Sequence, residues 1–339
     1  MAEALSITDT TYAGEAASYF ITRPVVEMDT VQKGCIHVED GIKKQFTIPR
    51  IEVSNFIQRR AATPVSQGTI AVDGQVLVPK DLMLYIEFNP RDYEAHWQAV
   101  NLNPKLLDRE LPPTAEEFTM LQTMKRLNEF FEKACWRSRL IFDPTNPSYA
   151  TPASKGQAIG DSVYFYFDGL MTKILNNAAT VQVSTPATLV AGTASVGQEN
   201  ISAALNRVYA SVPQAILFKY GAKGLKFHVS YLTQQIYEQD LLLGPYKNQD
   251  TTEKGINRYK GYDVVPLAGM PDNTIVACIS SPDQESNLWL GVNSTEDEKG
   301  LQLARLQANS ELYFIKGLFK MDTQVGFADF IVIYTTITA

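Results

Sequence analysis

The sequence predicts an α+β protein in which one domain is inserted between parts of another. Three observations predict this class. Two β-type runs come early in the chain, a long stretch of helical periodicity follows, and the last fifty residues return to β-type patterns. A chain of 339 residues with 45% hydrophobic residues can bury a large core, and its length is enough for about two domains.

Composition disfavours several classes of protein. The 37 acidic and 30 basic residues give a net charge of −7 without a basic block, which disfavours direct binding to nucleic acid. Cys35, Cys135 and Cys278 lie far apart, so we expect buried free thiols rather than disulfides or a zinc site. The N-terminus lacks the pattern of a signal peptide, and no apolar run is long enough to cross a bilayer. We therefore expect a cytosolic protein.

The first hundred residues predict an arm and a ribbon. Residues 1–45 are polar and weakly periodic, which suits an extended arm lying on something else. Residues 46–100 contain two strand patterns, and Asp73-Gly74 has the composition of a tight hairpin turn. Arg59 and Arg60 lie in the same ribbon, either pairing with a carboxylate on a neighbouring surface or forming a solvated edge. An isolated ribbon is marginal in water, so it needs a neighbour within the chain or in another copy.

A long helix follows the ribbon. Pro112-Pro113 stops any earlier start, and Thr114 with Glu117 forms a capping box. An apolar stripe then recurs every three to four residues: Phe118, Leu121, Met124, Leu127, Phe131 and Ala134. A helix from Thr114 to about Leu140 would be on the order of 40 Å long, and we expect its stripe to contact the core.

The segment "INRYKGYDVVPLAGMPDNTIVACI", residues 256–279, predicts two strands joined by a turn. Gly261 permits close backbone approach, and Pro266 suits a sheet edge. Pro271 with Asp272-Asn273 predicts a turn before the buried run 274–279. The segment contains no concentration of catalytic residue types, so it shapes the protein rather than a reaction.

The search for chemistry assigns no catalytic, cofactor-binding or metal-binding residue. Walker A, GxGxxG, GxSxG and HExxH motifs are all missing from the sequence. His37 and Glu39 would share a strand face, but such pairs are common, and His96 and His228 have the surroundings of packed or capping residues. The acidic run at 294–300 is expected to be a solvated loop rather than a cation site.

Taken in order, these parts resemble the major capsid protein of tailed bacteriophages, with the Hong Kong 97 fold. The segments that carry the resemblance are "DLMLYIEFNPRDYEAHW", the long helix, "FDGLMTKILNNA", "KFHVSYLTQQIYEQDL" and "YKGYDVVPLAGMP". The resemblance implies an N-terminal arm (1–45), an extended β-ribbon loop (46–100), a spine helix with the first part of a peripheral domain (101–190), an axial domain (191–300) and the C-terminal peripheral strands (301–339).

The resemblance also implies a function. Such a chain is no enzyme and has no cofactor; it assembles with itself into hexameric and pentameric capsomers of an icosahedral shell in the bacterial cytoplasm. Portal, scaffold and decoration proteins are implied partners, DNA is touched only non-specifically, and no membrane is involved. The assembly candidates are Arg59, Arg60, Asp73, Gly74, Gly261 and Pro271.

Several points stay open at this stage. Numbering begins at a methionine, so no removed pro-segment is expected and any scaffold would be a separate protein. No motif identifies a lysine–asparagine crosslink. Two alternatives remain: an encapsulin-like bacterial compartment shell, and a soluble α+β enzyme, which would need a pocket of convergent polar groups.

Overall fold

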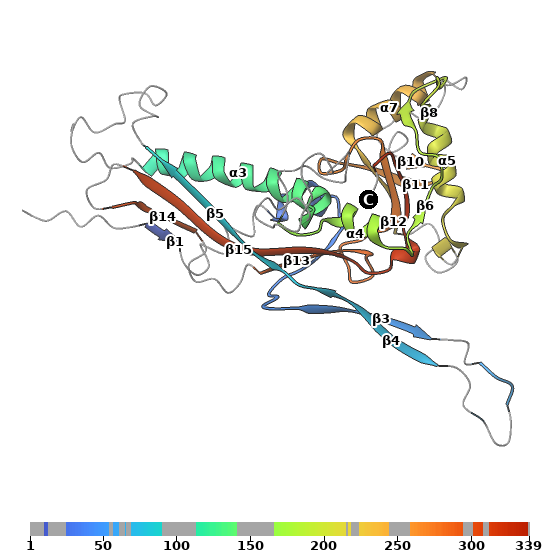
Figure 1. The fold of residues 1–339 in the computed structure, drawn as a ribbon, viewed down its shortest axis with the longest axis horizontal. Coiled ribbons are helices and arrows are strands. Elements are labelled where there is room, and N and C mark those ends of the chain that lie inside the picture. Colours follow the sequence, from blue (N-terminus) through green and yellow to red (C-terminus); the bar gives the residue numbers. More distant parts are fainter. Residues whose placement is uncertain are drawn as a thin grey trace, which may run out of the picture.

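The computed structural model describes residues 10–12, 25–53, 57–60, 65, 69–89, 113–140, 166–214, 216–217, 224–243, 258–293, 301–307 and 312–337. Figure 1 shows an elongated body with a long helix along one half, a second layered part at the other end, and a two-stranded ribbon that projects away from both. Two six-stranded sheets form the body.

The first sheet is organised around one long strand, β15 (Tyr313–Val325). The strand order is β1-β14-β15-β13-β2, and β5 also pairs with β15. The partners are β1 (Thr10–Tyr12), β2 (His37–Glu39), β5 (Lys80–Phe88), β13 (Leu288–Asn293) and β14 (Leu301–Arg305). β5 and β14 flank the first part of β15, and β13 pairs with its last part. β15 is therefore the element that joins strands from both ends of the chain.

The second sheet has the order β10-β11-β9-β12-β16-β6. Its strands are β6 (Val181–Gln182), β9 (Leu225–Ser230), β10 (Arg258–Tyr259), β11 (Tyr262–Leu267), β12 (Thr274–Ile279) and β16 (Val332–Thr335). Alternate residues of β12 face two different cores, because Val276 and Cys278 join the core around the long helix while Ile275 and Ala277 join the core under α5 (Ile201–Ala210) and α7 (Tyr231–Leu243). The buried run predicted at 274–279 is thus confirmed.

The long helix α3 (Pro113–Arg137) confirms the helix predicted from the apolar stripe, and it ends three residues before the expected Leu140. It begins at Pro113, one residue before the predicted cap, because proline is favoured at the first helical position. Its last two turns bury Phe131, Ala134 and Trp136 completely. The short helix α4 (Leu170–Asn176) packs beside this end. The C-terminal part of α3 is therefore enclosed by both sheets.

The predicted N-terminal arm is wrong for residues 25–45. α2 (Asp29–Gln32) and β2 are integral parts of the core, and Met28, Thr30 and Cys35 are fully buried. β2 pairs in parallel with β13. These elements are only three or four residues long, too short to produce a visible hydrophobic period. Residues 1–9 and 13–24 of the predicted arm lie outside the described residues.

The two sheets do not follow the predicted division at residue 300. β13 lies in the predicted axial segment but pairs in the first sheet, and β16 lies in the predicted peripheral segment but pairs with β12 in the second. The chain crosses between the sheets more often than a single insertion would require.

The predicted hairpin turn at Asp73-Gly74 is also wrong. Both residues lie inside a continuous strand, β4 (Ile70–Leu77), which pairs antiparallel with β3 (Phe46–Val53). Gly74 is opposite Pro49, and a Cβ added there would lie 2.6 Å from Thr47 Cγ2. The same Cβ would lie 2.7 Å from the carbonyl oxygen of Ile48, so the glycine permits close approach of the β3 and β4 backbones. The two strands are connected through residues 54–69 instead.

The turns of the second sheet confirm one expectation and correct another. Lys260 and Gly261 both have positive φ, 49° and 88°, and link paired Tyr259 and Tyr262 as a two-residue hairpin turn. Gly261 is thus required for its conformation, whereas the predicted close approach is wrong because nothing lies within 4 Å of a Cβ added there. The predicted turn after Pro271 is confirmed directly before β12.

We expect Gly269→Ala to destabilise the protein by about 2 kcal/mol or more, because overpacking against backbone cannot be relieved by a rotamer change. A Cβ at Gly269 would lie 2.4 Å from the carbonyl oxygen of Glu132 in α3. Gly326→Ala is the matched control, since its added Cβ would meet nothing closer than 3.6 Å. Urea unfolding measures both; equal midpoints for the two variants would contradict a tight contact at Gly269.

Candidate functional site

The histidines have the partners of structural residues. His37 Nε2 lies 3.2 Å from Glu39 Oε2, its Nδ1 lies 2.7 Å from Pro282 O, and its ring packs edge-on against Trp289. His228 is fully buried between Val276 O, at 3.2 Å, and Ser280 Oγ, at 3.0 Å. This geometry is consistent with the expected packing role of His228 and with the expected strand-face pair of His37 and Glu39. His96 lies outside the described residues.

The thiols are buried and protonated. Cys35, Cys135 and Cys278 are free and fully buried, as predicted. Burial raises the pKa of Cys35 to about 11 and raises the pKa values of Cys135 and Cys278 further above their usual range. A thiol in this state is a poor nucleophile. In the described part of the chain, no three His, Cys, Asp or Glu side chains gather as metal ligands. None of the helices there combines the length and apolar character needed to cross a bilayer.

Burial lowers the pKa of His228 to about 3, and the charge of Lys226 adds to the shift. The unfolded chain therefore binds this proton near the ordinary value of 6.5, while the folded chain does not. The free energy of unfolding should fall as pH drops below 6.5, by about 2 kcal/mol at pH 5 from this residue alone.

His228→Gln keeps a donor and an acceptor but cannot titrate, so its stability should change less between pH 7.5 and pH 5. Urea midpoints at both pH values measure the difference between the two chains. Other titrating groups are common to both and cancel in this comparison. Parallel pH dependences would contradict the assignment.

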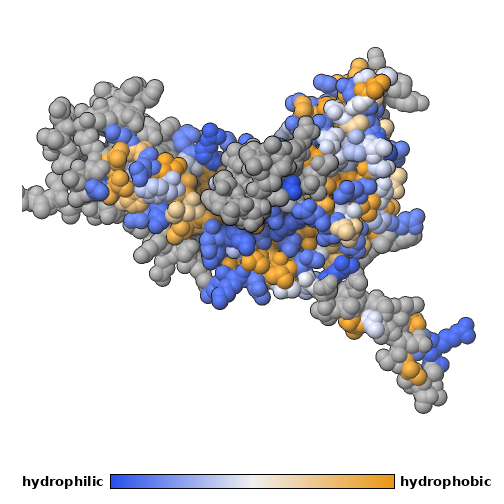
Figure 2. Space-filling model, viewed as in Figure 1, coloured by the Kyte–Doolittle hydropathy of each residue, from blue (hydrophilic) through white to orange (hydrophobic). Residues whose placement is uncertain are grey.

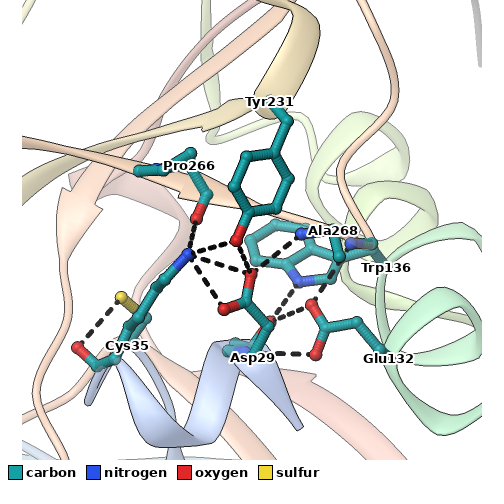
Figure 3. A network of polar contacts seen from close by, with 10 residues as sticks. Asp29, Cys35, Glu132, Trp136, Tyr231, Pro266 and Ala268 are labelled. Carbon is teal, nitrogen blue, oxygen red and sulfur yellow. Dashed lines mark hydrogen bonds and ion pairs between the residues drawn. The ribbon is translucent and has the colours of Figure 1, made fainter. Parts of the chain in front are cut away.

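A buried carboxylate joins three segments at the end of α3 (Figure 3). Glu132 accepts hydrogen bonds from Thr30 N at 3.1 Å, Thr30 Oγ1 at 2.6 Å and Gly269 N at 3.2 Å. Trp136 Nε1 donates to Thr30 Oγ1. Burial raises the pKa of Glu132, while the Thr30 and Gly269 donors oppose that rise. With all its oxygens engaged, this carboxylate connects α2, α3 and the turn before β12.

A second set of contacts continues this network toward the surface (Figure 3). Lys33 Nζ donates to Tyr231 OH at 2.8 Å and to Pro266 O at 2.6 Å, and it pairs with Asp29 at 2.9 Å. Asp29 also accepts from Ala268 N. Burial alone would lower the pKa of Lys33, but the Tyr231 and Asp29 contacts raise it overall. Every partner is part of the scaffold, so the network holds α2 against the second sheet and leaves no group free for acid–base chemistry.

The ribbon of β3 and β4 is fixed to the body at its root. Leu77 is fully buried with Ile42, Ile48 and Trp289. Val78 N donates to Asp322 Oδ2 at 3.0 Å, and Lys173 Nζ lies 3.0 Å from Asp322 Oδ1. Asp322 belongs to β15, so the strand that organises the first sheet also anchors the ribbon.

Beyond its root the ribbon carries exposed apolar side chains. These are Ile57, Val65, Ile70 and Val76, with Ile57 79% exposed; Val78, at the root itself, is 38% exposed. Arg59 and Arg60 are exposed between β3 and β4. Gly74 lies in β4, closer to the root of the ribbon than Arg59 and Arg60. Gly261 is exposed in the second sheet, and Pro271 is buried. The side chain of Asp73 lies outside the described residues. The structure therefore brings these six predicted assembly residues to several places rather than one.

A groove between α3 and the first sheet was missed by the sequence analysis. Its volume is about 500 Å³. Its lining comes from β5, α3 and β15, with Tyr166: Leu82, Met83, Leu84, Ile86, Phe88, Gln122, Thr123, Arg126, Leu127, Phe130, Tyr166, Ile315 and Phe319. Apolar side chains dominate this lining, and Arg126 is its single charged residue. The groove can therefore hold an apolar segment but offers no acid–base pair for catalysis.

Removing the Asp322 carboxylate should loosen the ribbon at its root. Asp322→Ala leaves Val78 N without its acceptor and Lys173 without its counter-ion, which should cost about 2 kcal/mol. Urea unfolding would measure the stability of the chain, and limited proteolysis would measure how readily the ribbon is cleaved. Asp81→Ala is the control, because Asp81 pairs with Lys320 of β15 while 84% exposed and should cost little. Equal effects of the two changes would contradict this role of Asp322.

Comparison with known proteins finds relatives by fold alone. No protein-family profile matches the sequence, and no curated protein matches it. A chain of the satellite phage P4 procapsid that includes size determination (Sid) protein has a TM-score of 0.61 at 10% identity, covering 98% of this chain and 94% of that chain.

Two further capsids match nearly the full length. A chain from the capsid of the empty GTA particle has a TM-score of 0.51 at 12% identity, covering 100% of this chain and 96% of that chain. A chain from the capsid of Myoviridae phage XM1 has a TM-score of 0.51 at 11% identity, covering 99% and 96%. The predicted fold is confirmed: the chain has the α+β, Hong Kong 97-type fold of phage capsid chains.

Proposed function

We propose that this chain is the major capsid protein of a tailed double-stranded DNA bacteriophage and assembles with itself into the shell that encloses the genome. The observation that carries the proposal is the full-length match to a procapsid chain, with 98% of this chain and 94% of the other covered. A match of this extent includes the ribbon and both sheets, so it is not limited to one common substructure.

The ribbon supports self-assembly on physical grounds. A two-stranded ribbon is marginally stable alone in water. Its exposed Ile57 and Val65 lie well away from the two cores, and Figure 1 shows the ribbon projecting from the body. Contact with a neighbouring copy would bury these side chains, and Arg59 and Arg60 would pair with carboxylates there.

The chemistry of the interior supports a structural role rather than catalysis. The buried thiols are protonated, His228 is neutral, and the α3 groove is lined largely by apolar residues. In a closed shell the chain would form hexameric and pentameric capsomers in the bacterial cytoplasm. We include portal, scaffold and decoration proteins among its proposed partners, with DNA touched only non-specifically.

Expression of the full chain tests the proposal. Sedimentation velocity and electron microscopy should find large closed particles or ring-shaped capsomers. Arg59→Glu/Arg60→Glu should reduce the yield of particles at least about tenfold, because reversing charges at an interface costs more than 1.4 kcal/mol.

The control is Lys43→Glu/Lys44→Glu, an equally adjacent and exposed pair near the ribbon root. It should assemble like the parent. A parent chain that remains a folded monomer at high concentration would overturn the capsid proposal, and normal particles from the Arg59/Arg60 variant would overturn the role of the ribbon arginines.

A further inference from the structure

We propose that Asp40-Gly41 is a site of spontaneous covalent modification, at which the aspartate converts to isoaspartate through a succinimide ring. The dipeptide lies between β2 and β3, and both of its residues are exposed. The reaction needs no enzyme and no reactant other than water. Its consequence is an extra carbon in the main chain at the root of the ribbon.

The decisive contact lies within the dipeptide itself. The N–H group of Gly41 donates a hydrogen bond to Oδ1 of Asp40 at 2.7 Å. The side-chain carboxyl group is therefore turned back onto the amide nitrogen of the next residue, and that nitrogen is the atom that attacks it. Groups held together in this way react faster than groups that must first find each other. Gly41 has a φ of 78°, which glycine adopts without steric cost, and it has no side chain to hinder the attack.

The atoms of the reaction balance without an oxidant or a reductant. In the carboxylic acid form of Asp40, the Gly41 nitrogen bonds to Cγ and loses its proton while the hydroxyl group of the acid leaves, so one water is released. Water then opens the ring at one of its two carbonyl carbons. Opening at Cγ restores aspartate, whereas opening at the main-chain carbonyl carbon leaves the chain running through Cβ and Cγ. The net reaction is therefore an isomerisation.

The chain contains two other Asp-Gly dipeptides, and the structure protects both. Asp168 Oδ1 accepts a hydrogen bond from Leu140 N at 3.0 Å, and Gly169 N donates to Ser138 O at 2.8 Å. Asp73-Gly74 lies inside β4, where pairing with β3 holds the backbone extended. Ring closure at either dipeptide would break native backbone contacts, whereas the Gly41 N–H already faces the carboxyl group that its nitrogen would attack.

The link that contains the dipeptide is too short to absorb an added carbon. Glu39, the last residue of β2, pairs with Gly291 of β13. Ile42 N donates to Val292 O of the same strand at 3.4 Å. The dipeptide therefore spans two contacts with adjacent residues of one strand, and a longer main chain would displace at least one of them.

Ile42 connects this link to the ribbon. Its side chain is buried with Ile48 of β3, Leu77 of β4 and Trp289 of β13. A Cβ added at Gly291 would lie 2.9 Å from Ile42 Cδ1, so this side chain has little room to shift. Figure 2 shows hydrophilic residues on the surface of the body beside the place where the ribbon leaves it in Figure 1. Water therefore reaches the exposed link, while the cluster beneath it depends on the position of Ile42.

Ageing of the purified full chain tests the chemistry. One sample is kept folded at physiological temperature and pH, and a second is kept in guanidinium chloride. Peptide mapping by mass spectrometry with electron-transfer fragmentation distinguishes isoaspartate from aspartate at all three dipeptides. In the folded chain, isoaspartate should form at position 40 at least about tenfold faster than at positions 73 and 168, whereas in the denatured chain the three rates should be similar. Similar rates at the three positions of the folded chain, or no isoaspartate at position 40, would overturn the assignment.

Asp40→Glu tests the consequence for the ribbon. Glutamate keeps the charge, but its ring would need six members and closes far more slowly, and fresh samples of both chains should be cleaved alike in limited proteolysis. After ageing, the ribbon of the parent should be cleaved at least about threefold faster in the fraction that carries isoaspartate, because the contacts at its root are displaced. The aged Asp40→Glu chain should be cleaved as before. An unchanged rate in the aged parent, or an equal increase in both chains, would overturn the effect on the ribbon.

Discussion

The fold depends on how closely two segments, α2 and the turn before β12, approach the last two turns of α3. The Glu132 carboxylate can be buried only because the backbone N–H groups of Thr30 and Gly269 reach it, and the second of these needs a glycine against the helix. A buried carboxylate without such donors would cost several kcal/mol. The same contacts hold α2 and the turn before β12 in place. They therefore position the second sheet relative to the first.

Local signals predicted the elements whose cause is local. Proline at positions 112 and 113 and an apolar stripe over several turns predicted α3, and Pro271 predicted the turn before β12. The prediction of a turn at Asp73-Gly74 was wrong because that dipeptide has only a small preference for a turn. Pairing of eight residues between β3 and β4 stabilises the strand by more than this preference. The segment around Thr30 was missed because its burial comes entirely from tertiary contacts of very short elements.

The surfaces were harder to predict than the fold. The α3 groove combines three segments that are far apart in sequence, so no window of residues contains its pattern. Apart from Arg59 and Arg60, the assembly residues chosen from the sequence were of types that favour turns. Of these, Pro271 is buried and Gly74 lies within a strand.

Charge is distributed differently in the parts that define the subunit and the parts left exposed. Glu132 and Asp322 are buried carboxylates with fixed backbone donors, and such groups tolerate only one arrangement of their neighbours. The exposed part of the ribbon instead carries the aliphatic side chains of Val65 and Ile70, whose dispersion contacts require no fixed direction. The buried carboxylates therefore fix the internal geometry of the chain, whereas these exposed side chains do not.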